Sequence, residues 1–356
     1  MKVGIIGLPQ TGKKTLFQVL TGSEVHEAGG PPKPIPGTAD IVDGRFDRLV
    51  ALYQPKKETR ARIDLVLLPK MEQESIAKGD IFRDISDVDA LCHVVRAFED
   101  DSIYHASGSV DPLRDVETVN SELLLHDQIF LEKRIERLET SLKKIKDERQ
   151  VKELDLLKRM QSHLENEQPL RLMDLTEEEE QLIRSYPLIT RKELILVFNV
   201  AEDNLDDTSL LERVRGICSA GKMEAMTVSA KVESEIALLD SEEERQDFLR
   251  DLGIVEPALE VLAKLCLKAL GRVSFFTVGK DEVHQWLVRV NSPAPVAAGA
   301  IHSDLQKGFI RAEVIKYDEL IAHGSEAELK KAGKLYVQGK DYIVVDGDIL
   351  NIRFNV

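Results

Sequence analysis

The sequence predicts an α/β protein whose main domain is built on a mostly parallel sheet. Three observations lead to this fold class. Short apolar runs alternate with polar, helix-length stretches in the first third of the chain, and a glycine-rich turn follows the first run. The last part of the chain, about 80 residues, is rich in β-type segments. Buried apolar runs separated by helices are typical of parallel strands that helices cover on both faces.

The first third supplies its elements in order. Residues 3–6 form the first predicted strand and residues 13–21 the helix after it. Residues 63–68 and 90–95 are the next buried strands, and the proline- and glycine-rich stretch 29–37 is a loop. His93 lies within a predicted strand, and we interpret it as a core residue rather than a catalytic base.

Residues 116–190 have a different composition and predict a helical insertion. Apolar residues repeat there with the 4-3 spacing of a coiled-coil seam, and a second apolar stripe follows a short polar stretch. This pattern predicts two antiparallel helices, and Thr176 with Glu179 predicts the capping box of a further helix. Strand character resumes at 194–198 and at 226–228. The two stripes are Leu131, Ile135, Leu138, Leu142 and Ile145, then Leu154, Leu157 and Leu164.

The C-terminal part predicts a separate, small, mixed β domain. Asp346-Gly347-Asp348 separates the last two β-type runs and predicts a hairpin turn between them. The predicted strands cover residues 273–278, 286–290, 309–315, 334–338, 342–345 and 349–354.

The composition excludes several classes of protein. A net charge of −15 argues against nonspecific nucleic-acid binding over the whole surface. Cys92, Cys218 and Cys266 lack C-x-x-C spacing, so we expect neither a disulfide framework nor a zinc site. No apolar run approaches the roughly 18–20 residues that span a membrane, and the N-terminal run leads into a glycine turn rather than a signal-peptide site. We therefore expect a cytoplasmic protein without membrane contact.

The turn after the first strand carries the clearest chemical motif. Gly7, Gly12 and Lys13 match the Walker A pattern G-x-x-x-x-G-K-[ST] between a predicted strand and a predicted helix. Backbone N–H groups of such a loop converge on phosphate oxygens, and the lysine reaches the terminal phosphates. Lys14 stands where the pattern has a Mg²⁺-binding Ser or Thr, with Thr15 one step later. The motif therefore predicts phosphate binding, in which Gln10 and Thr11 also take part, but no metal site.

Two further segments predict contacts with a nucleotide base. Asn199 and Glu202 follow a predicted strand in the arrangement N-x-x-E, where a GTPase has N-K-x-D. Aspartate there accepts hydrogen bonds from guanine, so Glu202 makes guanine specificity unfavourable. Ser229, Ala230 and Lys231 follow the next strand, where such proteins place a base-contacting turn. Each triplet alone is a weak signal that ordinary strand-end loops also produce, but their order downstream of the P-loop makes them reinforce one another.

With these motifs, the sequence resembles the YchF family of Obg-like ATPases, within the P-loop GTPases. The resemblance covers nearly the whole chain and implies three parts: a P-loop G domain (1–115 and 191–272), a coiled-coil insertion (116–190) and a TGS-like β-grasp domain (273–356). It also implies ATP in preference to GTP, slow hydrolysis, and association with the ribosome or its RNA. The matching segments beyond the P-loop and Asn199-x-x-Glu202 are 93–101, 110–115, 230–235, 248–253, 301–304, 307–314, 347–348 and 354–356.

The chain departs from the family pattern around the metal. The family has N-V-G-K-S-T in its P-loop and a D-x-x-G after the second strand, where this chain has Leu67-Leu68-Pro69-Lys70. The segment 71–89 is shorter than the family's mobile switch, and Thr38 is the nearest candidate for the family's first-switch threonine. We expect the Lys14 ammonium to lie near the metal position and partly replace its charge; the alternative is that Lys14 points into solvent.

The leading interpretation is a monomeric, purine-nucleotide-binding protein with weak or absent ATP hydrolysis that regulates translation on the ribosome. GTP remains an alternative ligand, Mg²⁺ binding is not supported, and no catalytic residue is assigned. A second interpretation is a working ATPase with Mg²⁺ held by the phosphates, waters and Thr15 or Thr38. A third is a structural interaction protein that binds no nucleotide.

Overall fold

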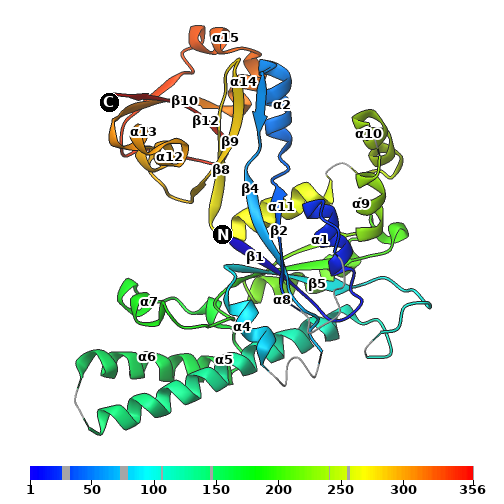
Figure 1. Cartoon of the computed structure of the whole chain (residues 1–356), viewed down its shortest axis with the longest axis vertical. Helices are drawn as coiled ribbons and strands as arrows, with labels where there is room; N and C mark the ends of the chain where they lie inside the picture. Colours follow the sequence, from blue (N-terminus) through cyan, green and yellow to red (C-terminus); the bar gives the residue numbers. More distant parts are fainter. Residues whose placement is uncertain are drawn as a thin grey trace. The chain divides into compact units, whose positions relative to one another are not determined.

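The computed structural model describes residues 1–25, 33–72, 79–105, 107–144, 147–239, 241–254 and 257–355 (Figure 1). The chain divides into two compact units, one of Met1–Thr38 with Asp64–Ala258 and one of Ala39–Ile63 with Leu259–Val356. Four predicted features lie wholly or partly outside the described residues: the loop 29–37, the short segment 71–89, Ile145 and the terminal Val356.

The first unit is built on a six-stranded sheet in the order β2-β4-β1-β5-β6-β7. The pairs β4–β1, β1–β5, β5–β6 and β6–β7 are parallel, so the predicted α/β class with a mostly parallel sheet is confirmed. The carboxyl ends of these parallel strands lie at one edge of the sheet, where ligand sites of such folds occur. The strands are β1 (Lys2–Ile6), β2 (Ile35–Asp40), β4 (Arg62–Leu67), β5 (Ala90–Arg96), β6 (Glu193–Asn199) and β7 (Glu224–Val228).

Helices cover this sheet because its central strands, β1, β5 and β6, are mainly apolar and buried on both faces. One core cluster joins Leu91 and Val95 of β5 to apolar side chains of α4, α5 and α8. The helix α1 packs against α9. The helices of this part are α1 (Lys13–Thr21), α4 (Asp80–Ser86), α8 (Ser209–Ala220), α9 (Ala230–Ala237) and α10 (Glu242–Asp251).

The insertion is a pair of long helices, α5 (Pro112–Leu142) and α6 (Glu148–Glu165), that lie side by side (Figure 1). Of the predicted seam, Leu131, Ile135 and Leu138 are buried in a cluster with residues of α6, which confirms the helical hairpin, whereas Leu142 at the end of α5 is only partly buried. On α6 the buried apolar residues are Leu156, Leu157, Met160 and Leu164, whereas the predicted Leu154 is only partly buried. The capping box of Thr176 and Glu179 is present at the start of α7 (Glu177–Ile183).

A buried carboxylate fixes the base of this insertion. Asp127 of α5 is fully buried and accepts hydrogen bonds from Ile189 N at 2.9 Å and from Thr190 N and Oγ1, each at 2.7 Å. His126 Nδ1 lies 3.2 Å from the same carboxylate. These bonds attach α5 to the segment through which the chain returns to β6.

The second unit contains a mixed sheet in the order β11-β10-β12-β8-β9-β3. The predicted strand 342–345 is wrong: Ile343 forms only an isolated bridge with Pro293, and Ala294 N donates to Tyr342 O. The turn at Gly347, with φ of 85°, therefore joins no hairpin, and β12 pairs with β10 and β8 instead. The strands are β3 (Lys57–Thr59), β8 (Arg272–Thr277), β9 (Glu282–Arg289), β10 (Phe309–Lys316), β11 (Tyr336–Gln338) and β12 (Asp348–Phe354).

Residues 39–63 and 259–272 belong to this second unit, whereas the predicted G domain includes them. Phe46 and Leu49 of α2 (Gly44–Tyr53) are fully buried in a core cluster with Phe276 and Val283. The strand β3 adds to the same sheet by pairing with β9. The other helices of the unit are α11 (Ala258–Ala269), α12 (Ala294–Ile301), α13 (Ser303–Lys307), α14 (Tyr317–His323) and α15 (Glu326–Lys331).

Candidate nucleotide-binding site

The predicted phosphate loop joins β1 to α1, and its glycines are required by its shape. Gly7 and Gly12 have φ angles of 154° and 86°, and Gln10 also has a positive φ of 60°. A Cβ at Gly12 would lie 2.1 Å from Asn199 Nδ2, and one at Gly7 would lie 2.5 Å from a backbone oxygen. Side chains at either position would therefore displace neighbouring atoms as well as strain the backbone.

Lys13, the first residue of α1, is a buried cation against this loop. Its Nζ donates to Gly7 O at 2.5 Å and lies 3.4 Å from Pro69 O, and the residue is only 5% exposed. Burial, with the charges of Lys70 and Lys14, lowers the pKa of Lys13 to about 7, whereas Glu72 acts in the opposite direction. The ammonium thus lies close to its titration point at neutral pH.

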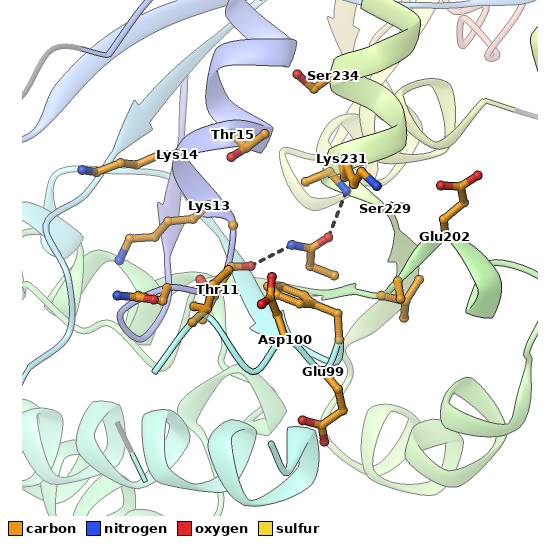
Figure 2. A pocket seen from close by; sticks show the side chains of 18 of the residues that line it. Thr11, Lys13, Lys14, Thr15, Glu99, Asp100, Glu202, Ser229, Lys231 and Ser234 are labelled. Atoms are coloured by element: carbon orange, nitrogen blue, oxygen red, sulfur yellow. Dashed lines mark hydrogen bonds between the residues drawn. The ribbon is translucent and has the colours of Figure 1, made fainter. Parts of the chain in front are cut away.

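Asn199, in the first of the two predicted base-contacting segments, connects the phosphate loop to the second segment, Ser229 to Lys231. It lies at the end of β6, where its Nδ2 donates to Thr11 O at 3.0 Å and its Oδ1 accepts from Ala230 N at 2.9 Å (dashed lines in Figure 2). Ser229 is the N-cap of α9, and Glu202 begins a short 3₁₀ helix, Glu202–Asn204. A single buried amide therefore holds three strand-end segments together.

These segments surround a cavity of about 890 Å³, within the range of sites that hold small molecules and cofactors. Figure 2 shows Lys13 and Lys14 on one side of it and Glu202 on the other. Of the twelve predicted residues, Gly7 does not line the cavity, and its contribution is the carbonyl that Lys13 contacts. The other eleven line it: Gln10, Thr11, Gly12, Lys13, Lys14, Thr15, Asn199, Glu202, Ser229, Ala230 and Lys231.

Further lining residues were not predicted. Phe98, Glu99, Asp100 and Ile103 follow β5, which lies beside β1 in the parallel sheet. Since carboxyl ends of parallel strands share an edge, this position was a signal that could have identified them. The remaining unpredicted residues are Lys70, Val200, Ala201, Asp203, Ser234 and Glu235.

The residues around the loop do not match the usual Mg²⁺ site of a P-loop protein. Lys14 takes the hydroxyl position, and Leu67, at the end of β4, takes that of the D-x-x-G aspartate. In the part of the chain that the structure describes, no three carboxylate, histidine or cysteine side chains gather as metal ligands. In nucleotide sites Mg²⁺ takes one or two protein oxygen ligands besides phosphates and waters, and here a lysine and a leucine stand at those two positions.

His93 of β5 lies beside this site, paired in register with Ile6. It is 1% exposed, as expected for a core residue, and within the described ranges neither ring nitrogen has a hydrogen-bond partner. Burial, with a smaller effect from Lys13, lowers the pKa of His93 to about 3. The folded protein therefore holds this imidazole neutral.

We expect His93 to make the stability of the protein depend on pH. Below pH 6.5 His93 is protonated in the unfolded chain but stays neutral in the folded protein. The free energy of unfolding therefore falls as the pH decreases from 6.5 toward 3, by up to about 1.4 kcal/mol per pH unit. Urea unfolding at pH 7 and pH 5 should show this loss, and His93→Leu should show a smaller one. Equal losses in both proteins would contradict the prediction.

A glycine turn between a parallel strand and a helix, its buried lysine and the adjoining Asn199 segments define a P-loop nucleotide-binding protein. Residues 273–355 match the family YchF-GTPase_C, described as "Protein of unknown function (DUF933)". The chain is 41% identical to Ribosome-binding ATPase YchF of Bacillus subtilis, with all of both chains aligned. It is 36% identical to Obg-like ATPase 1 of Caenorhabditis elegans, covering all of this chain and 92% of the relative.

The same relationship is found among solved structures. The structure of the Schizosaccharomyces pombe YchF GTPase matches with a TM-score of 0.80 at 28% identity, covering 99% of this chain and 97% of that one. The chain belongs to the YchF family. The resemblance inferred from the motifs is thereby confirmed. Among the described residues, no helix is long and apolar enough to cross a membrane.

Proposed function

We propose that the protein binds purine nucleotide in this cavity, with ATP preferred over GTP, and that it hydrolyses ATP weakly or not at all. The observation that carries the proposal is the arrangement around Asn199, which joins the phosphate loop to the start of α9 on one wall of the cavity. The phosphates would lie against the loop N–H groups and Lys13, and the base against the segments at 199–202 and 229–231.

The preference for ATP is supported by Glu202. In N-K-x-D, the aspartate accepts from the N1–H and amino group of guanine, which adenine does not present in that pattern. Glu202 lines the cavity but carries its carboxylate one methylene further from the backbone. The carboxylate is therefore wrongly placed to accept from guanine, whereas the binding of adenine does not depend on this contact.

Competition for the site tests this preference. We expect ATP to displace a fluorescent ATP analogue at a lower concentration than GTP does. Glu202→Asp should improve competition by GTP by about tenfold, equivalent to one hydrogen bond to a charged group. Glu212→Asp, on α8 and absent from the cavity lining, is the matched control. Equal competition by the two nucleotides in the unaltered protein would contradict the preference.

Weak hydrolysis follows from the cationic side of the cavity. Phosphoryl transfer relies on a metal ion to offset the charge that develops on the phosphate oxygens, and its loss should cost several kcal/mol of transition-state stabilisation. Lys14 and Leu67 replace the two protein contacts that such a metal ordinarily has. The chain's own residues can bind and orient the nucleotide, but no described group is placed by its geometry as a catalyst.

We further propose that the protein is a regulator that binds the ribosome. Relatives that align along their full length at about 40% identity are named ribosome-binding ATPases. The surfaces we assign to this contact are the α5–α6 hairpin and the C-terminal sheet domain. Sedimentation through a sucrose cushion should recover the protein with ribosomes, and its loss from the pellet on Lys13→Met would show that nucleotide controls the contact. Absence from the pellet with and without ATP would contradict the proposal.

A further inference from the structure

Two lysines line the cavity, and both belong to the segments where the family pattern has its Mg²⁺ ligands. Lys14 lies in the first turn of α1, one residue after Lys13, and Lys70 follows β4 at the fourth position of the D-x-x-G segment. Both line the cavity that contains the phosphate loop. The two lysines belong to different elements: Lys14 to the helix that follows the loop, and Lys70 to the segment after the neighbouring strand β4.

The sheet explains why Lys70 reaches the loop. β4 and β1 are parallel neighbours with Leu67 opposite Ile5, so both chains leave the sheet at the same edge. Pro69 O lies 3.4 Å from Lys13 Nζ, which places the residue before Lys70 against the loop. The pKa of Lys13 gives independent support, since the charges of both Lys70 and Lys14 lower it.

One carboxylate must be weighed against these cations. Glu72 raises the pKa of Lys13 and is therefore within electrostatic range of the same site. A carboxylate there could help to hold a metal ion. In nucleotide sites, however, the protein supplies only one or two of the oxygen ligands of Mg²⁺, and here Lys14 and Leu67 stand at those two positions. Two ammonium groups nearby also repel a divalent cation.

We propose that Lys14 and Lys70 take the charge-neutralising role of Mg²⁺, so that the site selects the metal-free triphosphate. Two ammonium groups supply the formal charge of one Mg²⁺, and ammonium is a ready phosphate partner. The metal-free triphosphate carries more negative charge than its Mg²⁺ complex and offers all its oxygens to the lysines. This inference rests on the proposed nucleotide site, and it specifies which form of the nucleotide that site takes.

Calorimetric titration of the full chain with ATP tests the inference, in excess EDTA and in excess Mg²⁺ at matched ionic strength. We expect the affinity in EDTA to exceed the affinity with Mg²⁺. An equal or lower affinity in EDTA would overturn the inference while leaving the proposed nucleotide site standing. No binding of ATP in either condition would overturn the proposed function itself, and the inference with it.

Variants identify the groups responsible. Lys14→Met and Lys70→Met should each weaken ATP binding in EDTA by about three- to tenfold, with the smaller effect at the exposed Lys70, and should change AMP binding little. Lys222→Met, an exposed lysine of the same unit that does not line the cavity, controls for net charge. Losses no larger than that of the control would overturn the inference.

Restoring the residues of the family pattern at positions 14 and 67 gives a complementary test. In Lys14→Ser with Leu67→Asp, the metal-binding hydroxyl and carboxylate of the family pattern are restored. We expect this variant to bind ATP more tightly with Mg²⁺ than in EDTA, the opposite order to the unaltered protein. If Glu72→Gln in the unaltered chain abolished a Mg²⁺-dependent gain in affinity, Glu72 would be a metal ligand and the inference would be wrong.

Discussion

Lys13→Met is expected to weaken ATP binding by about a hundredfold. Lys13 is the cation nearest the phosphate loop, and two charge-assisted hydrogen bonds to phosphate are worth about 3 kcal/mol together. The neutral methionine has a similar length, so it fills the same space without offering a donor. Displacement of a fluorescent ATP analogue measures the change. A loss of threefold or less would show that this loop does not bind the phosphates.

The same lysine predicts how ATP binding depends on pH. Its pKa is about 7 in the folded protein, so above pH 7 much of the population carries a neutral amine. Phosphate favours the charged form, which means that ATP binding takes up a proton and weakens as pH rises through 7 toward 9. Calorimetry in two buffers of different ionisation enthalpy measures that proton. The Lys13→Met variant should show no such uptake at this position.

Loss of ATP binding in Lys13→Met must be separated from loss of the fold. A buried ammonium whose pKa is lowered makes the folded state less favourable at pH values below 7, so removing it should not reduce stability there. Urea unfolding at pH 6 checks this. A marked decrease in the unfolding midpoint would mean that the variant lost ATP because it lost structure.

Asp127→Ala is expected to destabilise the first unit by about 3 kcal/mol or more. The carboxylate is fully buried, and its removal leaves the N–H groups of Ile189 and Thr190 and a hydroxyl without their acceptor. Each unsatisfied buried donor costs about 1–3 kcal/mol. Urea unfolding followed by far-UV circular dichroism measures the change.

An exposed aspartate on the neighbouring helix provides the control for Asp127→Ala. Asp155 lies on α6, is exposed, and can be replaced by alanine with little expected loss. If Asp127→Ala were as stable as Asp155→Ala, the carboxylate would not be what attaches α5 to the segment before β6.

Much of the first unit could be predicted because its signals are local. The parallel strands are short apolar runs, and the α5–α6 seam repeats at helical spacing, so neighbouring residues alone reveal both. The position of α2 could not be predicted in the same way. Phe46 and Leu49 mark an amphipathic helix, but nothing nearby in sequence shows that their partners are Phe276 and Val283.

The error at residues 342–345 has a different origin. This run has the composition of a strand, yet its backbone bonds go to irregular chain: Val344 N donates to Ser292 O, and Tyr342 O accepts from Ala294 N. Asp348 further fixes the turn, since its buried carboxylate accepts from Tyr342 and from Val345 N. Tertiary hydrogen bonds thus override strand propensity.

For the site, the motifs identified the loop and the two base segments because each follows a strand at a fixed spacing. They did not identify Phe98 or Asp100, since no motif marks the end of β5 and only the strand order brings it beside β1. Lys70 stands where the D-x-x-G pattern has its glycine, but its place in the cavity depends on the pairing of β4 with β1.

The assignment of residues 39–63 to the second unit has a consequence for the order of synthesis. This segment is made early, whereas β8, β9 and β12, with which it shares a sheet and core, are made only after residue 271. Until then Phe46 and Leu49 lack the apolar side chains that bury them in the folded protein. The nascent chain must therefore keep an apolar helix without its packing partners while residues 64–258 of the nucleotide-binding unit are translated. A chain that stops before residue 272 would leave this helix exposed permanently.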